Sequence, residues 1–282
     1  MGALWMLAAG LLFACMGVFV KLGAAYFSHV ELVFYRSVSG LLLMFAIVRY
    51  RDIPIATRCW QKHLSRGISG TAALMLFFYC ITALPLASAI TLNYTAPLFL
   101  TLLTTVFLKQ RIQPKLLVAI ATGFAGVILL LHPTLRQDLL LSGLLGLASG
   151  FLAGVAYLNV KQLGDLGEPA SRIVFYFSMT ASLCSGAYML TGHPHPITPQ
   201  GAAILVGMGS TATLAQLAMT KAYRVGDTLI VGSLAYSTIL FASVFGMLLW
   251  GETPSPAGWL GMLLIIAGGM LSLQLSQKHS AQ

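Results

Sequence analysis

Asn93–Gly126, NYTAPLFLTLLTTVFLKQRIQPKLLVAIATGFAG, and Ala235–Gly268, AYSTILFASVFGMLLWGETPSPAGWLGMLLIIAG, are the two stretches that decide the fold. Each contains two apolar segments joined by a short polar turn, and the two align at an offset of 142 positions. Identical pairs at this offset include Tyr94 and Tyr236, Pro114 and Pro256, and Gly126 and Gly268. Earlier in each half, FYRS at 34–37 matches FYFS at 175–178. The second half is therefore predicted to repeat the first.

The turns inside the two stretches differ in charge. The first contains Lys109, Arg111 and Lys115, whereas the second, around Glu252, contains no Lys or Arg. The basic connector 49–66 and its counterpart 191–199 differ in the same way. Because Lys and Arg concentrate in cytoplasmic loops, equivalent connectors are expected to face opposite sides of a membrane. Such inverted repeats are typical of secondary transporters, with the substrate site near the bilayer midplane between the repeats.

The composition requires lipid as the solvent. Hydrophobic residues make up 58% of the 282 residues and charged residues 8%, against about 25% charged in soluble domains. The net charge of +9 would suggest nucleic acid for a soluble protein. Here the basic residues fall at the ends of apolar segments, where they set orientation, so no nucleic-acid partner is expected.

About 20 predominantly apolar residues cross a bilayer as a helix, and ten such segments are predicted. They span 3–21, 30–48, 67–84, 87–108, 115–132, 141–160, 172–190, 200–220, 228–250 and 257–275. The predicted fold is an all-α integral membrane protein of ten transmembrane helices in two inverted five-helix repeats. The first repeat comprises residues 1–138 with helices 1–5, and the second comprises residues 139–282 with helices 6–10.

The basic residues also predict the orientation. With the N-terminus inside, thirteen of the sixteen Lys and Arg are cytoplasmic, Lys21 and Arg136 lie outside, and Arg36 falls within a span. The thirteen are Arg49, Arg51, Arg58, Lys62, Arg66, Lys109, Arg111, Lys115, Lys161, Arg172, Lys221, Arg224 and Lys278. Both termini are therefore predicted to be cytoplasmic. The first apolar segment is interpreted as a retained helix rather than a signal peptide.

Two motifs carry a family resemblance: ITALPLASAITLNYTAPLF at Ile81–Phe99 and LLWGETPSPAGWLGMLLIIAGG at Leu248–Gly269. The whole chain resembles the EamA-type branch of the drug/metabolite transporter superfamily. Gln110 occupies the position equivalent to Glu252, and Ile239 occupies the position equivalent to Pro97. A role shared by both repeats is therefore not expected for either the Glu or the Pro. The resemblance implies transport of a small metabolite, such as an amino acid, a nucleotide-like compound or a vitamin, in a multi-pass protein of the bacterial inner membrane.

Polar residues deep in the spans are the candidates for substrate contact, because a polar group in hydrocarbon needs a partner or water. In the fourth span Asn93 and Thr101 share a polar face, with Tyr94 beside it, and Tyr236 occupies the equivalent depth in the ninth. We expect these two spans to face a central cavity. Small and hydroxylated residues that pack helices together are the alternative interpretation.

Arg36 is the cation predicted within a span, about 9 Å along its helix at 1.5 Å per residue. It can anchor the helix by reaching the interface or pairing with Glu31. It can equally bind a substrate carboxylate or phosphate with its planar guanidinium group. The sequence leaves both roles open.

Further polar and aromatic residues are weaker candidates, since Tyr offers both a ring and a hydroxyl to a ligand. They are Gln216 in the eighth span, Tyr157 and Asn159 in the sixth, Tyr79 in the third and Tyr176 in the seventh. Packing or placement at the membrane interface is the favoured interpretation for any single one of them. Gly146, Gly150 and Gly154 form a GxxxGxxxG helix-packing motif, either within the chain or between chains.

The seven carboxylates lie in connectors or at span ends, which favours exchange or facilitated movement over proton relay through a buried acid. Glu31 and Glu252 are the exceptions considered, and sodium coupling stays open. An enzyme is disfavoured because the six His lie outside span centres and no HExxH occurs, although His193 and His195 could hold a metal. A channel is disfavoured because the sequence shows no charge rings or filter-like motifs. A scaffold without transport is disfavoured as well. We predict a secondary transporter with no cofactor, contacting its small-molecule substrate and lipid, and its oligomeric state is left open.

Overall fold

The computed structural model describes residues 2–107, 114–131, 137–192, 194–226 and 228–280, all of whose regular elements are helices. The helices are α1 Gly2–Gly23, α2 His29–Tyr50, α3 Trp60–Ala83, α4 Leu86–Asn93, α5 Ala96–Phe107, α6 Pro114–Leu131, α7 Gln137–Asp165, α8 Ala170–Met189, α9 Pro199–Val225, α10 Thr228–Ala235, α11 Ser237–Trp250 and α12 Pro256–Ser280. The pairs α4–α5 and α10–α11 each form one interrupted crossing, so the described helices make ten crossings, as predicted.

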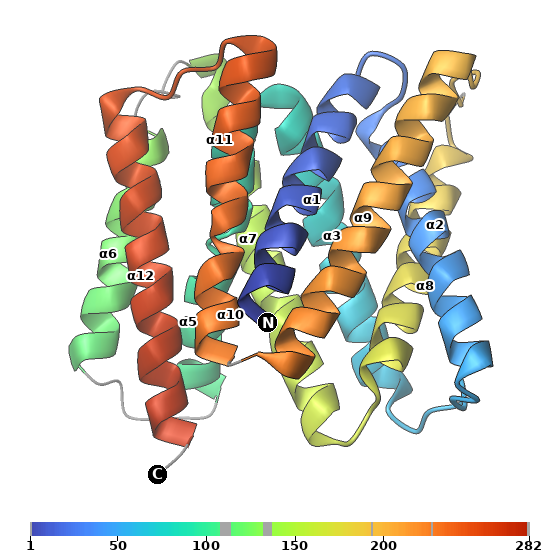
Figure 1. The fold of residues 1–282 in the computed structure, drawn as a ribbon, viewed down its shortest axis with the longest axis horizontal. Helices are drawn as coiled ribbons and strands as arrows, with labels where there is room; N and C mark the ends of the chain where they lie inside the picture. Colours follow the sequence, from blue (N-terminus) through green and yellow to red (C-terminus); the bar gives the residue numbers. More distant parts are fainter. Residues whose placement is uncertain (1, 108–113, 132–136, 193, 227, 281–282) are drawn as a thin grey trace.

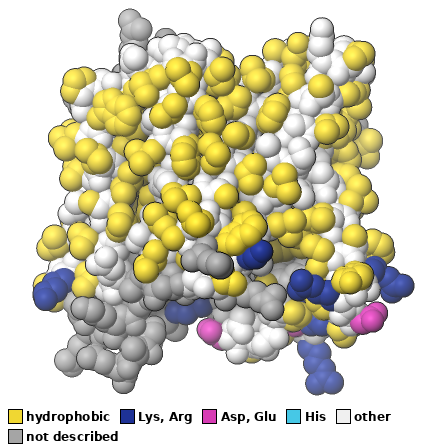
Figure 2. Space-filling model, viewed as in Figure 1, with side chains coloured by type: hydrophobic (Ala, Val, Ile, Leu, Met, Phe, Trp, Pro, Cys, Tyr) yellow, Lys and Arg dark blue, Asp and Glu magenta, His cyan; other side chains and the backbone are white. Residues whose placement is uncertain are grey.

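The crossings form an upright bundle (Figure 1). Figure 2 shows hydrophobic side chains over the visible flank and Lys and Arg gathered near the end where the C-terminus lies. Several residues singled out from the sequence lie outside the described ranges: Lys109, Gln110, Arg111, Arg136 and His193.

Helix ends follow from local chemistry. Ser28 caps α2 in a capping box, with its hydroxyl accepting from the backbone N–H of Glu31 while the Glu31 carboxylate accepts from the N–H of Ser28. Thr198 caps α9 and is followed by Pro199 in the first helical position. Helix α11 ends at Gly251, whose φ of 64° is a left-handed conformation that suits glycine.

The contacts between helices come in matched pairs, one from each half of the chain. Helix α6 packs on α12 and α2 on α8, which are equivalent helices of the two halves. The contact between α1 and α9 corresponds to the contact between α7 and α3. In the same way, the contact between α1 and α11 corresponds to the contact between α7 and α5. The two halves are thus interleaved around a common centre rather than laid side by side.

Glycines bring the backbones of α6 and α12 together. A Cβ placed on Gly126 would lie 2.6 Å from the carbonyl oxygen of Gly261, and one on Gly268 would lie 2.6 Å from the backbone nitrogen of Gly123. Real Cβ atoms do not approach backbone so closely, so this interface requires glycine.

The GxxxGxxxG motif packs within the chain. A Cβ on Gly150 would lie 2.7 Å from the carbonyl oxygen of Leu92, and one on Gly154 would lie 3.1 Å from that of Ala96. The motif therefore lets α7 approach the backbone where α4 gives way to α5, which settles the alternative that the sequence left open.

Candidate functional site

Two crossings are interrupted at equivalent positions, Tyr94–Thr95 between α4 and α5 and Tyr236 between α10 and α11. Backbone hydrogen bonds at the interruptions join residues that are three apart. The N–H of Thr95 donates to the carbonyl of Leu92, and the N–H of Tyr236 donates to the carbonyl of Ser233. Such tightened turns inside a helix occur at hinges or where the sequence is under strain. Pro97 contributes to the first interruption because it has no N–H to offer the carbonyl of Asn93.

The two interruptions lie side by side in the bundle. The rings of Tyr94 and Tyr236 are 5.9 Å apart between centroids, and the Tyr94 hydroxyl donates to Oγ1 of Thr238 at 2.8 Å. Nδ2 of Asn93 donates to Oγ of Ser149 at 3.2 Å. Tyr236 is 3% exposed, and its buried hydroxyl has no partner among the described residues. A free hydroxyl in a dry interior is costly unless something else bonds to it.

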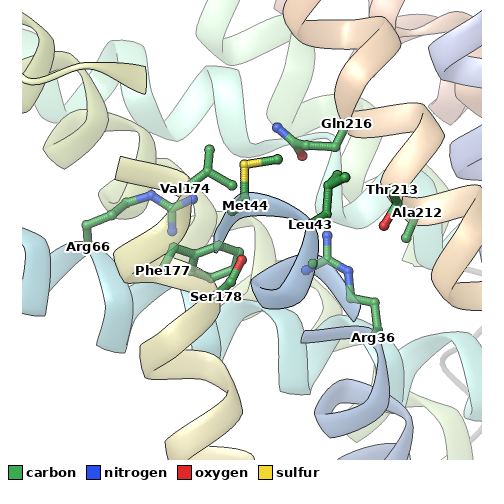
Figure 3. Close-up of a pocket in the computed structure, with 11 residues that line it drawn as sticks. Arg36, Leu43, Met44, Arg66, Val174, Phe177, Ser178, Ala212, Thr213 and Gln216 are labelled. Carbon is green, nitrogen blue, oxygen red and sulfur yellow. The ribbon is translucent and has the colours of Figure 1, made fainter. Parts of the chain in front are cut away.

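A cavity of about 60 Å³ lies between α2, α3, α8 and α9 (Figure 3). Two of the predicted site residues, Arg36 and Gln216, line it. The other lining residues are Gly40, Leu43, Met44, Arg66, Val174, Phe177, Ser178, Ala212 and Thr213. It is small beside the ~300–1,000 Å³ of ordinary small-molecule sites, so a metabolite would require these helices to separate.

Arg66 is a site residue that the sequence interpretation missed. The charge pattern assigns it to the basic connector 49–66, but α3 begins at Trp60, so Arg66 lies in the second turn of the helix and lines the cavity. Its guanidinium carbon stacks 4.2 Å from the centroid of the Phe177 ring. Counting apolar residues did not place Arg66 in the helix because the first turns of α3 are polar. Gly67 and Gly70, which follow Arg66 and pack closely in the structure, are the sequence signal that could have indicated a helix here.

Arg36 is a lining residue of the cavity rather than an interface anchor. The proposed pairing with Glu31 is absent among the described residues, because that carboxylate bonds to Ser28 and His195 instead. Nε of Arg36 and Nε of Arg66 are buried and have no partner in the described part of the chain. Arg36 and Arg66 are also close enough to affect each other electrostatically.

Tyr157 and Tyr223 lie within electrostatic range of the interruptions, and Tyr157 also of Arg66. Tyr157 interacts electrostatically with Arg66 and with the pair Tyr94 and Tyr236, and Tyr223 of α9 joins the same group. Tyr157 is 46% exposed. Tyr223 was not singled out in the sequence, since it lies among the basic residues that end α9.

Four predicted site residues lie elsewhere. The hydroxyl of Thr101 bonds to the carbonyl of Pro97, and the amide of Asn159 to that of Val155, each within its own crossing. Tyr79 lies toward one end of the bundle, with its ring 5.5 Å from that of His29. Tyr176 lies toward the other end and donates to the carbonyl of Ile55 at 3.0 Å.

A partly buried ion pair lies at the end of the bundle opposite the basic one. Nζ of Lys21 bonds to the Glu252 carboxylate and, at 3.1 Å, to the carbonyl of Leu84. The other oxygen of Glu252 accepts from the N–H of Leu86 at 2.8 Å. Trp250 lies beneath the ammonium, 5.0 Å away. These bonds tie α1, the start of α4 and the connector between α11 and α12 together.

Two Glu–His contacts occupy equivalent positions at opposite ends of the bundle. Glu31 at the start of α2 contacts Nδ1 of His195 at 2.8 Å. Glu168, just before α8, contacts Nε2 of His63 at 3.3 Å. The first contact joins α2 to the connector between α8 and α9. The second joins the connector before α8 to α3. His195, considered as a metal ligand, is thus engaged by a carboxylate, and the described residues contain no group of three metal-ligating side chains.

The Glu168 cluster makes a testable contribution to stability. Burial raises the pKa of this carboxyl, but bonds from Thr57, Arg172 and His63 outweigh burial and hold the pKa below its ordinary value. A lowered pKa means that the contribution is full above the ordinary Glu range, near pH 4.5, and is lost as pH falls through the folded value. Glu168→Gln should lower the free energy of unfolding by about 1–3 kcal/mol at neutral pH and flatten its acid dependence.

Thermal unfolding of purified protein across pH 3.5–7.5 measures this effect. Asp165→Asn, at the carboxylate of the last residue of α7, is the matched control. A Glu168→Gln protein with the melting temperature and pH profile of the wild type would show that the cluster is not stabilising.

The family model for the EamA-like transporter family matches residues 1–132 and again residues 140–274. The chain belongs to the EamA-like transporter family. This EamA-like protein is 29% identical over 270 residues to a pseudopaline exporter of Pseudomonas aeruginosa, covering 96% of the chain and 92% of the relative. It is 28% identical to an uncharacterized transporter of Helicobacter pylori, covering 96% and 93%. It is 27% identical to a riboflavin transporter of Vibrio cholerae, covering 99% and 95%.

A solved structure with 16% sequence identity matches the EamA-like chain with a TM-score of 0.69, covering 98% of both chains. At that identity the match shows the fold alone. The family and the named relatives indicate a multi-pass membrane transporter of a small metabolite, as the sequence predicted, and they indicate transporters rather than enzymes.

Proposed function

We propose that the chain moves a small polar or amphipathic metabolite across the bacterial inner membrane by alternating access around the centre of the bundle. The observation that carries the proposal is the pair of helix interruptions, 142 positions apart in sequence and in ring contact at Tyr94 and Tyr236. Interrupted helices between repeats hold substrates in secondary transporters because their backbone groups are freed near the midplane. The proposed cargo is an amino acid, a nucleotide-like compound or a vitamin, and riboflavin, named for one relative, is a vitamin.

The proposed organisation is two repeats, residues 1–138 and 139–282, with both termini in the cytoplasm. The double match of the family model supports this division, and the division falls in the first turn of α7. The basic residues at one end of the visible surface support the orientation (Figure 2).

We place the substrate against Arg36, Gln216, Tyr157 and the group Asn93, Tyr94 and Tyr236. The cavity lining, the tyrosine cluster and the unpartnered Tyr236 hydroxyl support this choice. Bonds within single crossings favour packing roles for Thr101 and Asn159, and positions near the ends of the bundle favour them for Tyr79 and Tyr176.

We propose that the end contacts act as gates that exchange during transport. The Lys21–Glu252 pair closes one end, and the Glu168 cluster lies at the other. Glu252 and Glu31, the two exceptions considered for proton coupling, each have partners in this structure. Exchange or facilitated movement is accordingly the proposed mode of transport.

Tyr236→Phe tests the central site. Because the hydroxyl has no partner among the described residues, its removal should leave the melting temperature unchanged or higher, while substrate affinity should fall by roughly 5–10-fold, equivalent to about one hydrogen bond. Asn93→Ala should also lower affinity. A thermal-shift screen of purified protein against a metabolite library, followed by flux of the hits in proteoliposomes, provides the measurement.

Two variants are controls. Tyr94→Phe loses a hydrogen bond to Thr238 and should lower the melting temperature, and Tyr50→Phe changes a tyrosine that is 90% exposed. If Tyr236→Phe and Asn93→Ala both transport with the rate and affinity of the wild type, the central site is wrong.

A further inference from the structure

Two guanidinium groups enter the same cavity from different helices. Arg36 comes from α2 and Arg66 from α3, and Figure 3 shows both groups pointing toward the middle of the cavity from opposite sides. Among the described residues that line this cavity, none is acidic. The remaining polar groups are neutral: the amide of Gln216 and the hydroxyls of Thr213 and Ser178.

Two positive charges without a counter-ion are unfavourable at this depth. Arginine in a membrane interior ordinarily pairs with a carboxylate or with backbone carbonyls, and a buried charge without a partner is strongly destabilising. No ion pair or side-chain hydrogen bond is formed by either guanidinium with the described residues, and both Nε atoms are buried. The two groups also repel each other electrostatically. Because the described residues supply no counter-ion, such an arrangement favours the binding of an anion.

We propose that the cavity binds a small metabolite that carries two anionic oxygen groups, carboxylate or phosphate, one for each arginine. This inference rests on the proposed transport function and specifies its substrate class. Each guanidinium can hold an oxyanion through two parallel N–H donors, which a lysine ammonium cannot do.

The surroundings of Arg66 fix its direction. Stacking on Phe177, with the guanidinium carbon 4.2 Å from the ring centroid, covers one face of the group and leaves the N–H donors in its plane available. Gly67 and Gly70 accompany it, and a Cβ on Gly70 would collide with the Arg66 side chain. The sequence therefore makes room for an arginine at this depth.

The test is thermal unfolding of the purified full chain with defined probes. Dicarboxylates of three to six carbons, inorganic phosphate and sugar phosphates are compared with the neutral diamides of the same dicarboxylates. At least one dianion is expected to raise the melting temperature by about 2–4 °C or more, with no rise from its diamide. If carboxylates act and phosphates do not, or the reverse, the anion source is assigned within the proposed class.

Variants separate binding from anchoring. Arg36→Gln and Arg66→Gln should each abolish the anion-dependent rise, while the ligand-free melting temperature stays equal to or above that of the wild type because an unpaired charge is removed. Arg36→Lys keeps the charge without the planar donors and should retain a reduced rise. Arg58→Gln, at an exposed arginine of the α2–α3 connector, is the matched control and should leave both quantities unchanged.

Several outcomes would overturn the inference. Arg36→Gln and Arg66→Gln proteins that melt well below the wild type and keep the anion response would identify both residues as structural anchors. Stabilisation and flux of a neutral or cationic metabolite, with no response to any dianion, would reject the substrate class and leave transport standing. Absence of flux for every compound that stabilises the protein would instead reject the proposed function.

Discussion

Replacing Gly268 by valine is expected to lower the free energy of unfolding strongly, because it forces apart two helices that touch backbone to backbone. The position faces the backbone of α6, where a Cβ would lie 2.6 Å from the nitrogen of Gly123 and 2.7 Å from the carbonyl oxygen of Ala119. Backbone cannot rotate away as a side chain can, so α6 and α12 must separate. We expect a loss of about 3 kcal/mol, the upper part of the range for overpacking, and a melting temperature ~6–12 °C lower.

Gly164→Ala is the matched control for this prediction. Gly164 lies in the last turn of α7, and a Cβ added there would have no atom within 4 Å. Alanine should therefore be neutral or stabilise the protein by up to about 1 kcal/mol through helix propensity. Differential scanning fluorimetry of both variants in detergent measures the contrast. Equal melting temperatures for Gly268→Val and Gly164→Ala would show that the α6–α12 contact is not as close as the structure places it.

The number and order of crossings could be predicted from the sequence, because each depends on a local property. Twenty apolar residues define a span wherever they occur, and charge in the connectors reports orientation. Even the depth of Tyr94 and Tyr236 followed from aligning the two halves. Tertiary approach could not be read in this way. The contact between α6 and α12 needs Gly126 to meet Gly261, and these residues gave no signal of being partners.

The cavity shows the same limit. Arg36 stood out because hydrophobic residues flank it on both sides, whereas Arg66 follows six residues that include Gln61, Lys62 and His63. A count of apolar residues begins the span at Gly67, just after Arg66, although the helix itself begins at Trp60. The two arginines share one cavity because α2, α3, α8 and α9 pack around it. Hydropathy along the chain does not predict that packing.

Glu252→Lys is expected to reduce transport by more than tenfold. The substitution places a second ammonium against Lys21 where the two side chains are 13% and 19% exposed, and it removes the carboxylate that accepts from the N–H of Leu86. Like charges with little solvent repel strongly, so the end of the bundle that this pair closes should open and stay open. A loss above tenfold corresponds to more than about 1.4 kcal/mol in the closed state.

The charge-swapped protein Lys21→Glu/Glu252→Lys distinguishes the ion pair from the other roles of Glu252. The swap restores opposite charges but leaves the N–H of Leu86 without its acceptor, so recovery should be partial and clearly above the Glu252→Lys rate. Lys115→Glu, which reverses an exposed charge at the start of α6, is the control and should transport at the wild-type rate. Initial flux of a screened substrate into proteoliposomes measures all four proteins. A swap no better than Glu252→Lys, or Glu252→Lys at the wild-type rate, would mean that the Lys21–Glu252 contact does not gate transport.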